Sequence, residues 1–186
     1  MKYRLLIISL MMGLIALYGC DKEETDTDLV AETSLTYVID DEIEVGTEER
    51  ASSYKVTFYQ RNSSFSMYMS QNTYDVDNIK DYYYLRMMVS SKSPLKLGHR
   101  YEIPTEEADG LWESFATFEC GQKESGYICK SGWVSINAMK IFANKAWCRI
   151  SGEFELVLRS VDDENDEIKI VSNPFTMDFN YVEVLE

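Results

Sequence analysis

Between Trp147 and Arg159 the chain reads WCRISGEFELVLR. Every second residue, beginning with Cys148, is apolar or glycine, and most of the residues between them are polar or charged. A period of two is the pattern of a β-strand with one buried and one exposed face, so we predict a long strand here. Its inward face comprises Cys148, Ile150, Gly152, Phe154, Leu156 and Leu158, and its outward face comprises Arg149, Ser151, Glu153, Glu155 and Arg159.

The same period recurs along most of the chain. Between Lys80 and Ser90 it predicts a strand with two different faces. One face carries Tyr83, Leu85, Met87 and Val89, and the other carries Tyr82, Tyr84, Arg86 and Met88. Further predicted strands have their apolar positions at Leu35, Tyr37 and Ile39, at Tyr54, Val56 and Phe58, at Phe65, Met67 and Met69, and at Phe175, Met177, Phe179 and Tyr181.

Short polar segments separate these predicted strands. They contain Gly, Pro, Asn, Asp and Ser, which favour turns, and they lie at 60–63, 91–94, 121–126 and 162–166. About ten short strands at this spacing are typical of an all-β fold. We predict a single antiparallel β-sandwich over residues 30–186, with a β-barrel as the alternative.

The first residues of the chain carry a different pattern. Lys2 and Arg4 precede an apolar run over residues 5–17. A run of this length fits the core of a signal peptide, for which about 7–15 residues are usual, whereas a membrane-spanning helix needs roughly 20.

The apolar run ends at Leu17-Tyr18-Gly19-Cys20, which resembles the lipobox of bacterial lipoproteins. Tyr18 departs from the smaller residue usual at that position. The resemblance implies that residues 1–19 are a signal peptide, removed by cleavage, and that Cys20 carries fatty acyl chains such as palmitate. Several chains on one cysteine make a stable membrane anchor. The alternative is an ordinary secretory signal with a chance cysteine.

An acidic segment, DKEETDTD, follows directly after Cys20. It contains no apolar residue and so cannot bury enough surface to offset the entropy of ordering. We therefore predict a flexible tether over residues 20–29. A lysine with acids at this place also resembles the surface-export signal of Bacteroidetes-type lipoproteins, which implies an outer-membrane protein exposed at the cell surface. A plain solvated linker, with the protein on the periplasmic face, is the alternative.

The charge of the chain excludes one class of partner. The chain has 32 acidic and 18 basic residues, a net charge of −14, and cleavage after residue 19 would remove two bases and no acid. A chain this acidic is repelled by phosphate backbones, so we predict no nucleic-acid partner. The predicted partners are the membrane, through the lipid on Cys20, and a glycan or protein ligand.

Three segments near the C-terminus form a series that resembles a known family. They are GWVSI at 132–136, RISGEFEL at 149–156 and KIVSNPF at 169–175. The series is similar to the closing strands of uncharacterised Bacteroidetes-type β-sandwich surface lipoproteins. Pro174 stands where a turn glycine is expected, and Leu156 replaces the second aromatic residue. The resemblance implies an architecture and a location but no active site.

Residues that could support catalysis or bind metal are few. His99, the only histidine, follows the turn-like Lys96-Leu97-Gly98, so we expect a solvent-facing turn residue rather than a catalytic one. No phosphate-binding loop, nucleophile elbow or metalloprotease motif is present. The acidic run at 162–166 lacks the glycine and the final glutamate of an EF-hand loop, so we expect a hairpin turn. No catalytic residue, metal site or cofactor is predicted.

Three cysteines follow Cys20. Cys120 and Cys129 flank a glycine-containing loop, so they are candidates for a disulfide if the protein lies in an oxidising compartment. Spacing alone does not establish the short Cα–Cα approach that a disulfide needs. Cys148 lies on the predicted inward face and is expected to be a small core residue.

Aromatic residues are the remaining candidates for ligand binding. If Tyr83 and Leu85 are in the core, their neighbours in the same strand face outward. Exposed rings can stack on sugar faces, and Tyr and Trp are enriched at binding surfaces, although aromatic residues are also common in sheets for packing alone. The candidates are Tyr82, Tyr84, Trp112, Trp133 and Trp147.

The function that we expect is that of a non-enzymatic surface lipoprotein that binds an extracellular glycan or protein. One alternative is a structural or adhesive subunit that assembles through an edge strand. A second alternative is a hydrolase that uses a pair of carboxylates.

Overall fold

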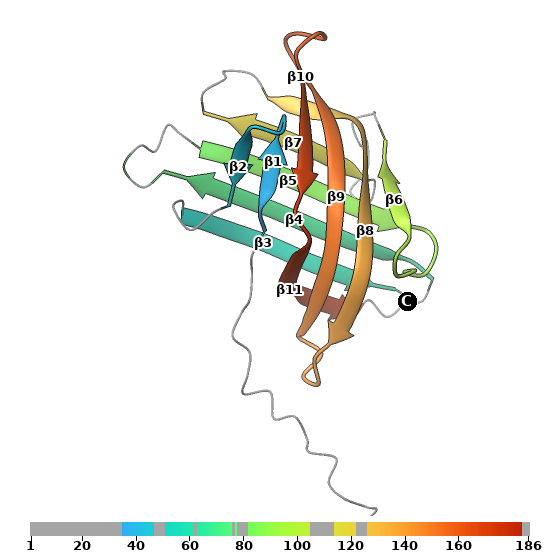
Figure 1. The fold of residues 1–186 in the computed structure, drawn as a ribbon. Coiled ribbons are helices and arrows are strands. Elements are labelled where there is room, and N and C mark those ends of the chain that lie inside the picture. Colours follow the sequence, from blue (N-terminus) through green and yellow to red (C-terminus); the bar gives the residue numbers. More distant parts are fainter. Residues whose placement is uncertain are drawn as a thin grey trace, which may run out of the picture. The chain divides into compact units, whose positions relative to one another are not determined.

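A computed structural model describes residues 35–46, 51–61, 63–75, 77, 82–104, 114–121 and 126–183. Within these ranges the chain forms eleven strands and no helix, and so no helix that could span a membrane. The predicted signal peptide, Cys20, the tether and Trp112 lie outside the described residues. The strands (Figure 1) are β1 Tyr37–Ile39, β2 Ile43–Val45, β3 Ala51–Gln60, β4 Phe65–Tyr74, β5 Tyr82–Ser91, β6 Arg100–Ile103, β7 Phe115–Cys120, β8 Tyr127–Ile141, β9 Trp147–Ser160, β10 Glu167–Ser172 and β11 Phe175–Glu183.

All these strands belong to one sheet, and the sheet closes on itself. The order of neighbours is β2-β1-β10-β9-β11-β3-β4-β5-β7-β8-β6, and an additional pairing joins β8 to β9. The closed part is a barrel of β9, β11, β3, β4, β5, β7 and β8, while β10, β1 and β2 extend it from β9 and β6 extends it from β8. The predicted all-β fold is confirmed, in its barrel form.

The barrel closes because β9 belongs to two layers. Its first half, Trp147–Gly152, pairs with β11, whereas its second half, Glu155–Arg159, pairs with β10. Along its other edge β9 pairs with β8, whose register shifts at two irregularities, between Cys129 and Ser131 and between Ile136 and Ala138. Bulges of this kind bend a strand and increase its twist. Figure 1 shows β3, β4, β5 and β7 running across the direction of β8, β9 and β10.

Two glycines of the C-terminal series lie where backbones approach closely. A Cβ atom on Gly152 would lie 2.3 Å from the Ser135 carbonyl oxygen and 3.0 Å from the Phe175 ring. A Cβ atom on Gly132 would lie 2.7 Å from a methyl carbon of Leu156. A side chain at either position would collide with these neighbours, so glycine is needed for space. Glycine otherwise weakens a strand, and in a strand it often marks a close approach of this kind.

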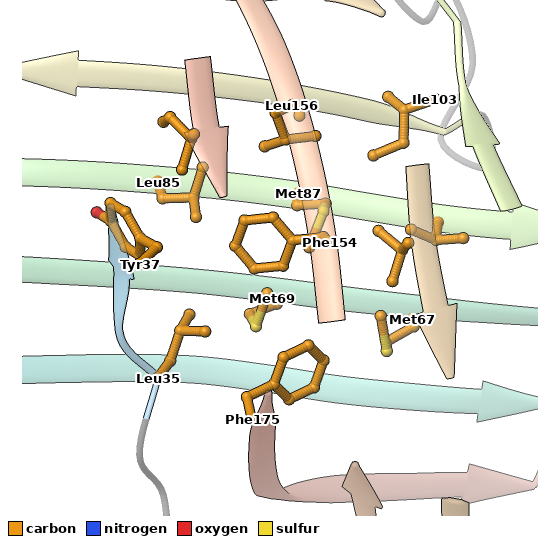
Figure 2. Packing of buried hydrophobic residues seen from close by; sticks show 14 of the residues in the cluster. Leu35, Tyr37, Met67, Met69, Leu85, Met87, Ile103, Phe154, Leu156 and Phe175 are labelled. Atoms are coloured by element: carbon orange, nitrogen blue, oxygen red, sulfur yellow. The ribbon is translucent and has the colours of Figure 1, made fainter. Parts of the chain in front are cut away.

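The core fills the space between the two layers. The inward positions predicted for β9 are all buried, with Phe154 1% and Leu156 0% exposed. Figure 2 shows the Phe154 ring with Met69, Met87 and Phe175 around it, and the ring centres of Phe154 and Phe175 are 6.3 Å apart. The buried hydrophobic core of the described residues extends from Leu35 to Tyr181. The domain thus contains its own core, so we expect it to fold without the leader.

Polar pairs connect neighbouring strands on the outer side of the barrel. Arg149 on β9 stands opposite Asp178 on β11. Its Nε donates a hydrogen bond to Asp178 Oδ1 at 2.7 Å, and its Nη2 donates one to Oδ2 at 2.9 Å. Bidentate pairs of this kind are among the stronger polar contacts, and here the pair joins the two strands next to the point of closure.

Candidate functional site

The outer face of β4 and β5 carries a group of tyrosines. On β5, Tyr83 and Leu85 point into the core and are 4% and 1% exposed. Since successive residues of a strand point to opposite sides, Tyr82 and Tyr84 lie on the outer face, where both are partly exposed. The structure thus brings together two of the aromatic residues singled out from the sequence.

The register of β4 against β5 adds two further residues to this group. Tyr74 stands opposite Tyr82, and Asn72 stands opposite Tyr84. These four side chains line a hollow of about 450 Å³. Tyr74 and Asn72 were not predicted as site residues, because only the register between the two strands shows that they face the tyrosines of β5.

Arg86 lies beside Tyr84, next to this hollow. Its Nε donates a hydrogen bond to Thr117 Oγ1 at 3.2 Å, and its Nη2 lies 3.4 Å from Glu119 Oε1. Its guanidinium carbon is 5.3 Å from the centre of the Tyr84 ring, a distance at which a cation is attracted by the ring face. Arg86 therefore restrains the Tyr84 ring and adds hydrogen-bonding groups next to the hollow.

The tryptophans do not join the tyrosines. Trp133 lies on β8, between Glu102 of β6 and Glu155 of β9 in the register, and the guanidinium carbon of Arg100 is 3.9 Å from its ring. Trp147 begins β9 and is 37% exposed. Within the described part of the chain, the candidate aromatics therefore occupy three separate places.

A second hollow, of about 370 Å³, lies where turns of the barrel meet. It is lined by Arg61, Ser64, Phe65, Ser66, Ser90, Ser91, Lys92, Pro104 and Ser114. Among the described residues that line these two hollows there is no carboxylate. The described part of each lining therefore contains no pair of acids of the kind that a glycoside hydrolase uses.

The candidate disulfide is not formed. Cys120, Cys129 and Cys148 are all buried free thiols. Phe118 on β7 pairs with Tyr127 on β8, and continuing this register places Cys129 opposite Ala116. Cys120 is four residues further along β7, about 13 Å at the usual rise of a strand, whereas a disulfide needs Cα atoms within about 7 Å.

Burial makes two of these thiols weaker acids than an ordinary cysteine thiol. It raises the pKa of Cys129 to about 11, and it raises the pKa of Cys148 to about 12, with a further contribution from the charge of Asp178. A nucleophilic cysteine instead has a lowered pKa and an accessible sulfur. Cys129 and Cys148 are therefore core residues, as the alternation predicted for Cys148.

His99 and the acidic run at 162–166, for which the sequence predicted turns without a catalytic or metal-binding role, lie in surface turns. His99 is exposed, directly before β6, and its ring packs edge-on against Tyr101. The acidic run at 162–166 forms the turn between β9 and β10, where Asp163 accepts a hydrogen bond from the Asn165 amide and Asp166 accepts one from the Tyr127 hydroxyl. Over the residues that the structure describes, no cluster of three His, Cys, Asp or Glu residues could hold a metal ion.

A polar group inside the barrel was not predicted. Gln71 is fully buried, and its Nε2 donates hydrogen bonds to the Leu35 carbonyl oxygen at 3.0 Å and to the Tyr54 hydroxyl at 3.3 Å. The Gln71 carbonyl oxygen and the Tyr37 hydroxyl have no hydrogen-bond partner among the described residues. Burial raises the pKa of Tyr37 well above its ordinary value, so this hydroxyl stays protonated.

No family model matches the chain, and no curated protein or solved structure is significantly similar to it.

Proposed function

We propose that this protein is a non-enzymatic, lipid-anchored envelope protein whose barrel binds an extracellular glycan. The lipobox-like Leu17-Tyr18-Gly19-Cys20 supports the anchor. The observation that carries the binding proposal is the hollow on the outer face of β4 and β5, lined by Asn72, Tyr74, Tyr82 and Tyr84.

The chemistry of this hollow suits a sugar ring. Tyrosine offers an apolar face on which the C–H bonds of a pyranose can stack, together with a hydroxyl at its rim. The Asn72 amide both donates and accepts hydrogen bonds, and Arg86 and Glu119 stand beside Tyr84. A concave surface with aromatic walls and a few polar groups is the usual form of a small ligand site.

The alternative functions find less support in the same geometry. The strands at the two ends of the sheet order are β2, with three residues, and β6, with four. Edges this short offer little backbone for pairing with another chain. For a hydrolase, the described lining of the two hollows lacks the necessary carboxylates.

A glycan array probed with residues 30–186, followed by calorimetry on the glycan found, tests the binding proposal. We expect Tyr82→Ala and Tyr84→Ala each to weaken binding by about tenfold or more, as is typical of aromatic residues at the centre of a binding surface. Tyr68→Ala is the matched control, because Tyr68 is a partly exposed tyrosine on the outer face of β4, opposite Met88 and away from the hollow.

Three results would contradict the binding proposal. They are an array without any bound glycan, equal effects of Tyr82→Ala and Tyr68→Ala, or binding of peptides in place of sugars. The anchor is tested separately by mass spectrometry of the natural product, in which we expect acyl chains on Cys20 and none in Cys20→Ser. An unmodified Cys20 would refute the anchor and leave the binding proposal in place.

A further inference from the structure

The β8–β9 hairpin differs in composition from the rest of the chain. From Ser125 to Gly152 the sequence contains no aspartate or glutamate, although 32 of the 186 residues are acidic. This stretch includes β8, the turn at 142–146 and the first part of β9. The same stretch contains four basic residues, Lys130, Lys140, Lys145 and Arg149. In a strongly acidic protein, the charged side chains of this hairpin are therefore all positive.

The tip of this hairpin carries exposed apolar side chains. Of the six large hydrophobic residues that are exposed among the described residues, three lie here: Ile141 at 44%, Trp147 at 37% and, beside them on β11, Val182 at 38%. The Tyr181 amide donates a hydrogen bond to the Ala146 carbonyl oxygen at 2.9 Å, so β11 and the turn are adjacent. We call Ile141, Phe142, Trp147 and Val182 the hairpin tip patch.

Both faces of the hairpin are apolar at this point. Ile141 pairs with Cys148 and so shares the inward side, but it lies beyond the core and stays exposed. Trp147 precedes Cys148 and takes the opposite side, and the Phe142 amide donates a hydrogen bond to the Trp147 carbonyl oxygen at 3.0 Å. At the last positions before the turn, each side of the hairpin therefore carries an exposed apolar side chain, Ile141 on one side and Trp147 on the other.

The charged groups around the patch are compatible with a lipid headgroup layer. Lys145 lies 3.6 Å from Glu183, and Arg149 is paired with Asp178. The two carboxylates of β11 are thus each matched by a cation. Long lysine side chains can keep their charge in the headgroup region while apolar neighbours insert more deeply, and Trp is enriched at that depth.

β1 begins at the end of the sheet that lies toward the tip of the β8–β9 hairpin. β1 and β9 are both antiparallel to β10, so both strands begin at the same end of the sheet. Tyr37 pairs with Ser172, and the β9–β10 register continues to place Ser172 beside Phe154. Tyr37 is therefore about seven residues, or about 23 Å, from the level of Trp147.

The tyrosine hollow lies away from the tip and would remain open to solvent. Trp147 at the tip pairs with Asn180, which stands beside Thr57 of β3. Asn72 of the hollow pairs instead with Ser53 of β3. That difference is four residues, or about 13 Å along β3.

We infer that the hairpin tip patch inserts into the interface of an anionic lipid bilayer, the one that carries the proposed anchor. Ile141, Phe142 and Trp147 enter the boundary between headgroups and acyl chains, and Lys140 and Lys145 stay among the headgroups. Such a contact is weak alone and gains strength from a second, covalent attachment, since stable anchoring generally takes two contributions. The contact would hold the barrel in one orientation on the membrane.

Co-sedimentation with vesicles of phosphatidylethanolamine and phosphatidylglycerol tests this inference. The protein is the mature chain from residue 20 with Cys20→Ser, so that no acyl chain contributes to binding. We expect it to bind, and we expect Ile141→Ser with Trp147→Ser to reduce the partition coefficient about tenfold or more. Ile43→Ser with Leu97→Ser is the matched control, because these residues are exposed to a similar degree elsewhere on the domain, and we expect a change of less than about twofold.

Three results would overturn the inference. They are absence of vesicle binding by the parent chain, equal binding by the tip variant and its parent, or a dimer in solution that only the tip variant loses, which would assign the patch to a second copy of the chain. Circular dichroism shows whether both double variants are folded. Because this assay contains neither acyl chain nor glycan, its failure would leave the proposed anchor and the tyrosine hollow untouched.

Discussion

Replacing Gly152 by alanine should destabilise the domain, because the added Cβ atom would prevent the close approach of β8, β9 and β11. The new Cβ atom would lie 2.3 Å from the Ser135 carbonyl oxygen, about 1 Å inside an ordinary contact, so the backbone of β8 or β9 must move. Overpacking of this kind typically costs about 1–3 kcal/mol. The loss of unfolded-state entropy on replacing glycine offsets only about 0.4–1 kcal/mol. Because the clash is with a backbone atom, we take the upper end of the first range and expect a net destabilisation of about 2 kcal/mol.

Gly126→Ala is the control for this prediction. The nearest atom to a Cβ on Gly126 is 3.8 Å away, and this glycine has no positive φ, so the substitution should be neutral or slightly stabilising. Urea unfolding and thermal melting of both variants measure the difference. For a domain of this size we expect Gly152→Ala to melt roughly 4–8 °C below the parent. Equal melting temperatures for the two variants would refute the close approach of the strands.

Three further predictions concern buried hydroxyl and thiol groups. Tyr37→Phe removes a hydroxyl that has no partner among the described residues, so urea unfolding should show a neutral effect or a gain of up to about 1 kcal/mol; a loss of that size would mean that the hydroxyl is hydrogen-bonded. Burial raises the pKa of the Cys129 and Cys148 thiols to about 11 and 12 in the folded protein. As the pH rises, these thiols therefore ionise in the unfolded chain at a lower pH than in the folded protein. Stability should therefore fall as pH rises from about 9 to 12, and a thiol reagent at pH 8 should react with Cys120, Cys129 and Cys148 only after unfolding; fewer than three reactive thiols would indicate a disulfide.

Local patterns in the sequence were sufficient to predict six of the described strands, β1, β3, β4, β5, β9 and β11, whereas they did not identify β2, β6 or β7. The alternation at 148–158 and at 175–181 identifies the residues that are buried in β9 and β11, because a strand that packs on one side needs apolar side chains only on that side. The outward position of Tyr82 and Tyr84 follows from the same rule. These predictions depend on neighbours in the chain and on nothing further away.

Pairing between distant strands could not be predicted in the same way. The parallel pairing of β11 with β3, and the change of partner halfway along β9, depend on contacts across most of the domain. The hollow was missed in part for this reason, since Asn72 and Tyr74 join it only through the register of β4 with β5. The candidate disulfide failed likewise, because the β7–β8 register separates Cys120 from Cys129.

The pairing of β3 with β11 also determines when the domain can be completed. Residues 57–60 of β3 pair with residues 180–183 of β11, so one edge of β3 stays without its partner until nearly the whole chain has been made. Pairings that are distant in sequence form slowly. Under the export across a membrane that we propose for this chain, this late step would delay closure of the barrel and keep the polypeptide unfolded long enough to be translocated.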